Sequence, residues 1–135
     1  MRVRHLSRER DDELVALMRA STVVGVGTGV QPAEYLQLQP LVDALHAELA
    51  ATRKVTDKGW QPRSRQVGIT GRSISPTLYV AVGLAGKFNH MVGVRGAGQV
   101  LAIYTDPTAP VFASADVGIV GDWREVVPLL AAAVR

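Results

Sequence analysis

The segment from Gly83 to His90 carries the most informative set of chemical groups in the chain. It contains two glycines, Lys87 and His90, and it joins a strongly apolar run to a segment typical of a helix. Backbone N–H groups at such a junction, together with a lysine and a histidine, could stabilise an anion. A lone histidine is more often a packed or surface residue, so His90 by itself does not establish such a site.

Two further segments raise the same question about anions. The glycines between Gly25 and Gly29 could let backbone amides approach a phosphate, but their spacing is not G-x-G-x-x-G and Pro32 interrupts the expected helix, which favours a structural turn. A basic cluster follows, in which Asp57 is the only acid. Its members are Arg53, Lys54, Lys58, Arg63, Arg65 and Arg72. The cluster could hold a phosphate or line a solvated loop, and charge alone does not decide.

Hydrolytic and metal chemistry find no support in the sequence. There is no cysteine, and His5, His46 and His90 are too far apart to form a recognisable ligand pair. Neither a G-x-S-x-G elbow nor an HExxH motif is present. We therefore predict no catalytic residue and no metal ligand.

Charge and composition narrow the classes of partner. The formal charge of +3 resides in the first ten residues, of which 1–6 are expected to form a flexible basic tail. Aromatic residues make up 5% of the chain, which argues against a nucleic-acid binder. No apolar run approaches the roughly 20 residues that span a bilayer, so we expect a cytoplasmic protein without membrane insertion.

Short apolar runs rich in β-branched residues alternate with helical segments. The predicted strands are Thr22–Gly25, Gln66–Thr70, Leu78–Leu84, Val100–Thr105 and Val117–Val120. The predicted helices are Ser7–Ala20, Glu34–Leu49, Gly86–Val94 and Trp123–Val134, and Ala50–Val55 fits a strand end with one helical turn. This alternation predicts one α/β domain, a doubly wound parallel sheet with helices on both faces. Ligands of such sheets bind outside the carboxyl ends of the strands, where the glycine segments lie.

Seven segments, in this order, resemble the C-terminal FAD-binding domain of the electron transfer flavoprotein alpha subunit. They are Ala51–Arg53, Asp57–Pro62, Gln66–Gly71, Ser75–Gly86, Asn89–His90, Thr105–Phe112 and Ala115–Asp122. The resemblance implies a Rossmann-like, DHS-like NAD/FAD-binding fold, with residues 1–135 as a single, free-standing FAD-binding domain. It also implies a module that binds FAD and relays electrons between redox protein partners, an electron carrier more than a substrate-transforming enzyme. A beta-like chain or a homo-oligomer would complete it.

The resemblance also implies where FAD is contacted. Near the isoalloxazine it places Thr52, Arg53, Val67, Gly68 and Thr70. At the pyrimidine edge it places His90 with its neighbour Asn89, at the phosphates Gly86, and at the adenosine end Asp122.

Four positions depart from the polar types of that family, namely Thr28, Ile69, Ala85 and Tyr104. Each lost hydrogen bond to a charged group costs roughly 1.5–3 kcal/mol, so together these changes could loosen FAD. An alternative therefore stays open, in which the same fold binds AMP or another adenine nucleotide, or serves only in partner assembly. A Ser-His-Asp triad or an enzyme acting on a small molecule has no positive support.

Overall fold

The computed structural model describes residues 15–134, so the expected tail at 1–6 and the start of the predicted Ser7–Ala20 helix lie outside the described residues. Five strands form one sheet in the order β2-β1-β3-β4-β5, and all four neighbouring pairs are parallel. The strands are β1 (Thr22–Val26), β2 (Glu48–Ala51), β3 (Leu78–Val82), β4 (Gln99–Tyr104) and β5 (Val117–Val120). The prediction of a doubly wound parallel sheet is confirmed.

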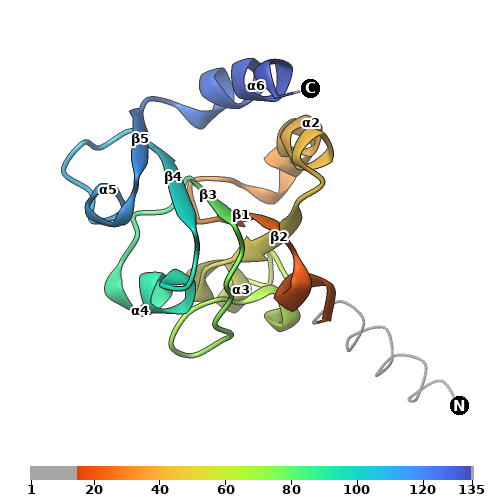
Figure 1. Ribbon diagram of the computed structural model, residues 1–135, viewed down its shortest axis with the longest axis vertical. Helices are drawn as coiled ribbons and strands as arrows, with labels where there is room; N and C mark the ends of the chain where they lie inside the picture. The colour runs from red at the N-terminus through yellow and green to blue at the C-terminus, as the bar shows by residue number, and fades with distance from the viewer. Residues whose placement is uncertain (1–14, 135) are drawn as a thin grey trace, which may run out of the picture.

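Helices cover both faces of this sheet (Figure 1). After a helical segment at 15–19, they are η1 (Pro32–Glu34), α2 (Tyr35–Leu45), α3 (Arg53–Asp57), η2 (Arg63–Arg65), α4 (Phe88–Met91), η3 (Val92–Val94), α5 (Val111–Ser114) and α6 (Trp123–Ala133). In Figure 1, α2 and α6 lie side by side above the sheet and α4 lies below it.

The alternation of side chains along each strand produces two separate apolar cores. On β1 and β3, Val24 and Val80 point to the core that α2 and α6 close. Their neighbours Val23 and Tyr79 point to the opposite core, which Leu17 and Met91 help to fill. Both faces of β1 and β3 are thus buried, which explains why their sequences are apolar runs without alternation.

The predicted helix Glu34–Leu49 is too long. Helix α2 ends at Leu45, because His46 adopts the left-handed conformation with φ 51°. The Ala47 N–H then donates to the Val42 carbonyl, closing the helix end, and β2 begins at Glu48. Strand β2 therefore begins within the segment that the spacing of apolar residues predicted to be helical.

The predicted strand Gln66–Thr70 is wrong. Only isolated bridges form there, from Gln66 to Ala51 and from Val67 to Arg72. Gly68 has φ 137°, and a Cβ at this position would lie 2.6 Å from the Asn89 carbonyl oxygen. The chain therefore turns beneath α4 instead of extending the sheet.

Candidate functional site

The connection from β1 runs to β2 on one side, whereas β3 lies on the other side of β1. In open parallel sheets this reversal creates a crevice outside the carboxyl ends of the strands. A pocket of about 420 Å³ occupies it, which falls in the range of roughly 300–1,000 Å³ typical of small-ligand sites. We call it the strand-end pocket. Its lining residues are Gly27, Thr28, Thr52, Arg53, Lys54, Val67, Gly68, Thr70, Gly83, Leu84, Ala85, Gly86, Lys87, Asn89, His90 and Tyr104.

Eight of the nine residues singled out from the sequence line this pocket, all but Asp122. They come from the start of α3 just after β2, from the turn that replaced the predicted strand, and from α4 and the loop that precedes it. The structure therefore brings together residues that are far apart in the chain. The segment Gln66–Thr70, although not a strand, forms part of the wall.

Glycines let the first two strand-end loops pack backbone against backbone. The Gly29 N–H donates to the Gly83 carbonyl over 3.0 Å. A Cβ at Gly27 would lie 2.4 Å from the same carbonyl oxygen. The first glycine loop is thus a structural turn, as its spacing favours, and it also contributes Gly27 and Thr28 to the pocket wall.

The loop after β3 offers unpaired donors. Between residues 15 and 134, the amides of residues 84–87 find no protein acceptor, although all four residues line the pocket. Residues 84–86 are buried or half-buried, where backbone donors are normally paired, so these N–H groups are available to an acceptor on a ligand.

His90 is buried, with 7% of its surface exposed, and both of its ring nitrogens are engaged inside the protein. Nδ1 lies 2.9 Å from the Val67 carbonyl oxygen and Nε2 lies 2.6 Å from the Tyr79 hydroxyl. A carbonyl can only accept, so Nδ1 carries the proton, and Nε2 of the neutral ring accepts from Tyr79. Burial lowers the pKa of His90, outweighing the Val67 hydrogen bond that raises it. The ring is therefore neutral, and its nitrogens are not free to donate to a ligand.

Gln66 is a buried support that sequence reasoning missed. Its Oε1 accepts from the Thr56 hydroxyl at 2.6 Å and from Arg63 at 3.2 Å. Its Nε2 donates to the Thr70 Oγ1 at 2.9 Å. Because the Thr70 oxygen accepts there, its own proton can point to another acceptor. The signal for Gln66 that the sequence offered was a polar residue at the start of a run with the composition of a buried strand.

The strand-end pocket is positively charged. Arg53, Lys54 and Lys87 line it, and no carboxylate does. Arg53 pairs with Asp57 at 3.4 Å, in α3 itself. The basic cluster seen in the sequence is thus divided, because Arg65 turns away to bind Glu48 at 2.7 Å.

Asp122 is not brought to the pocket. Its carboxylate caps α6 by accepting from the Arg124 N–H at 2.9 Å, which lowers the pKa of Asp122. Its neighbour Trp123 contacts the first glycine loop, since the indole N–H donates to the Gly29 carbonyl over 3.0 Å. Helix α6 is therefore tied to the first glycine loop.

The four departures from the family pattern fall in different places. Thr28, Ala85 and Tyr104 line the pocket, as cofactor contacts would. Ile69 is 57% exposed and is not part of the lining.

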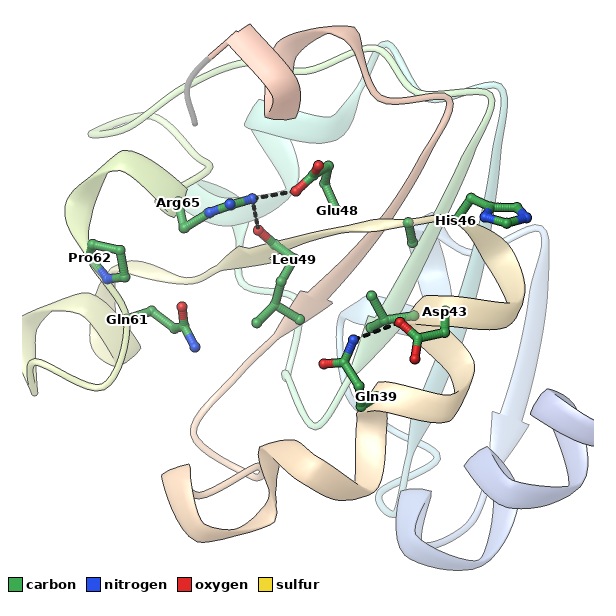
Figure 2. A pocket seen from close by; sticks show the side chains of 10 residues that line it. Gln39, Asp43, His46, Glu48, Leu49, Gln61, Pro62 and Arg65 are labelled. Carbon is green, nitrogen blue, oxygen red and sulfur yellow. Dashed lines mark hydrogen bonds and ion pairs between the residues drawn. The ribbon is translucent and has the colours of Figure 1, made fainter. Parts of the chain in front are cut away.

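A second hollow of about 670 Å³ runs along the outer edge of β2 and shares no residue with the strand-end pocket (Figure 2). Its polar groups are largely paired with one another: Arg65 with Glu48 and the Leu49 carbonyl, and Gln39 with Asp43 at 2.7 Å. Although larger, this hollow is a shallow surface groove. In the part of the chain that the structure describes, there is no cluster of metal ligands and no helix able to cross a membrane.

Comparison with known proteins points to one family. The model of the electron transfer flavoprotein FAD-binding domain matches residues 16–95. Protein FixB of Bradyrhizobium diazoefficiens is 40% identical over 128 residues, 94% of this chain and 35% of its own length. A probable mitochondrial electron transfer flavoprotein subunit alpha of Schizosaccharomyces pombe is 43% identical over 116 residues, 84% of this chain and 34% of its own length.

The chain thus spans about a third of the length of these relatives. A crystal structure from Bacillus subtilis, provisionally assigned as a phosphosugar isomerase, superposes on 94% of this chain and covers 42% of its own, with a TM-score of 0.51 at 17% identity. That likeness concerns the fold alone.

Proposed function

Since this chain belongs to the electron transfer flavoprotein alpha family, through its FAD-binding domain, we propose that the strand-end pocket binds FAD and that the module relays electrons between protein partners. The observation that carries the proposal is the convergence of eight predicted contact residues on one cationic pocket. The proposed FAD binding concerns the strand-end pocket alone, and electron relay, which the longer relatives' names suggest, is proposed for this chain as well.

The groups in the pocket fit such a cofactor. The free amides of residues 84–87 match phosphate or carbonyl oxygens, and three cations without a lining carboxylate match an anionic ligand. Thr52 and Thr70 add hydroxyl groups, and Leu84 and Val67 add apolar wall. The combination of apolar surface with a few convergent polar groups is typical of cofactor sites.

FAD, when bound, supplies one- and two-electron transfer. Arg53 would place a positive charge beside the electron-accepting end of the ligand, which favours its gaining an electron. Neutral His90, fixed by Tyr79 and Val67, would hold the turn at Gly68 in place instead of contributing charge. An electron carrier needs access to partners, and we propose a beta-type chain or a second copy as the first of them.

The direct test is titration of FAD into the folded chain, followed by quenching of flavin fluorescence. Binding at micromolar FAD is expected, and its absence with folded protein would defeat the proposal. A thermal shift with AMP or ADP but none with FAD would favour the flavin-free alternative.

A second measurement tests the role of Arg53. Replacement by methionine should lower the reduction potential of bound FAD by tens of millivolts, because ~1.4 kcal/mol of lost charge stabilisation corresponds to about 59 mV for one electron. Arg95→Met is the matched control, since Arg95 stacks on Phe88 at 5.5 Å and does not line the pocket. Equal reduction potentials of bound FAD in the two variants would contradict a role of Arg53 in stabilising the reduced flavin.

A further inference from the structure

The chain has three lysines, and two of them line the strand-end pocket. Lys54 lies in α3, directly after β2, and Lys87 precedes α4, after β3. Because β1 lies between β2 and β3 in the sheet, these two lysines flank the carboxyl end of β1. Both side chains line the same pocket as Gly27 and Thr28, and they are close enough to interact with each other.

Neither ammonium group has a carboxylate partner between residues 15 and 134. The third lysine is different, because Lys58 lies over the Trp60 ring at 5.4 Å. A hydrogen bond that only the neutral Lys54 amine can accept from Lys87, together with the repulsion between the two charged groups, lowers the pKa of Lys54. Two like charges held together without a counter-charge repel each other, and a bound anion would relieve that repulsion.

We propose that Lys54 and Lys87 form a two-point anion site that binds the diphosphate bridge of a dinucleotide. The inference rests on the proposed function, for which it names the side chains that recognise phosphate. Lysine ammonium groups bind phosphate as point charges, and the free amides of residues 84–87 stand beside Lys87 as further donors. Both lysines lie outside the seven segments that carry the family resemblance.

Lys54 and Lys87 also line the pocket in which this chain lacks polar side chains of the family. Thr28 and Ala85, two positions that depart from the polar types of the family, line the same pocket. A lysine from each neighbouring strand end would supply charge-assisted hydrogen bonds in this pocket, which are roughly twice as strong as neutral ones. The site would therefore retain the cofactor in spite of those departures.

The test compares three probes on the full chain: FAD, riboflavin, which lacks phosphate, and inorganic pyrophosphate. The double variant Lys54→Met/Lys87→Met should weaken FAD binding about tenfold or more, flatten its salt dependence and abolish pyrophosphate binding. Riboflavin affinity should not change. Lys58→Met is the matched control and should bind all three probes as the wild type does.

The outcomes separate this inference from the proposed function. Wild-type affinity of the double variant for both FAD and pyrophosphate would overturn the lysine site while FAD binding stands. Pyrophosphate binding that depends on the lysines, in a folded chain that ignores FAD, would support the anion site and defeat the flavin function. An equal loss of riboflavin and FAD affinity in the double variant would also count against the site, because the lysines would then not be reading phosphate.

Discussion

The Tyr79 hydroxyl lies 2.6 Å from Nε2 of His90, inside the core beneath the strand-end pocket. The two rings are tilted by 42° with centroids 5.9 Å apart. Tyr79 is fully buried, and burial raises its pKa, so the phenol keeps its proton and donates it to the imidazole. This pair, with the Val67 carbonyl on the other side of the ring, connects β3, α4 and the turn at Gly68 into one wall of the site.

Replacement of Tyr79 by phenylalanine should destabilise the fold. The substitution leaves Nε2 of His90 buried without a donor, and such a loss costs about 1–3 kcal/mol in the free energy of unfolding. Denaturant unfolding measures it. Tyr104→Phe is the control, since no hydrogen bond of the Tyr104 hydroxyl is seen between residues 15 and 134, and it should stay within about 0.5 kcal/mol of wild type. Equal stability of the two variants would contradict the assigned hydrogen bond.

Stability should fall as the pH drops below 6.5. The folded-state pKa of His90 is lowered from its usual 6.5, so the unfolded chain takes up the proton at a higher pH than the folded protein does. Proton uptake therefore stabilises the unfolded state relative to the folded state. The stabilising contribution is therefore complete above pH 6.5 and is lost as the pH falls toward the folded-state pKa. Unfolding free energies between neutral and mildly acidic pH should show a smaller slope in His90→Gln. An unchanged slope would mean that another group governs this range.

Replacement of Gly25 by alanine should disrupt the same wall from the opposite side. A Cβ on Gly25 would lie 1.7 Å from the Tyr79 hydroxyl oxygen, so Tyr79 or β1 must move. Overpacking of this kind costs typically about 1–3 kcal/mol, and more where a central strand cannot shift. Gly121→Ala is the matched control, because its Cβ would meet only Val126, at 3.5 Å. A Gly25→Ala protein as stable as this control would refute the close contact.

Loss of the indole donor at Trp123 should loosen the first glycine loop. Trp123→Phe removes the hydrogen bond to the Gly29 carbonyl and should cost about 1 kcal/mol of unfolding free energy. FAD affinity should fall severalfold as well, since Gly27 and Thr28 line the pocket. Leu129→Ala, on the same helix and 74% exposed, should change neither quantity. Unchanged affinity in Trp123→Phe would show that α6 does not support the site.

The sheet could be predicted from the sequence because strands buried on both faces, such as β1 and β3, appear as short apolar runs rich in β-branched residues. The end of α2 could not, since His46 takes a left-handed conformation that usually calls for glycine or asparagine. Gln66–Thr70 has the composition of a strand but is bent by Gly68, whose neighbours across the turn come from α4. Composition cannot show such a tertiary contact.

Sequence reasoning could identify those site residues that lie in the segments resembling the family in the same order. Thr52, Gly68 and His90 were found this way, and they converge because parallel strands end on one side of the sheet. The approach of Lys54 to Lys87 was hidden, because it depends on β1 separating β2 from β3. Asp122 lies outside the lining of the strand-end pocket, where its carboxylate caps α6, and its contact with the adenosine end stays a prediction.

Amide chemical shifts of the isotopically labelled full chain, recorded while FAD is added, test the central claim most directly. The account predicts the largest shifts at residues 84–87, Thr52 and Gly68, with His46 and Gln61 in the groove along β2 unmoved. Shifts confined to that groove, or none at all with saturating FAD and folded protein, would contradict it.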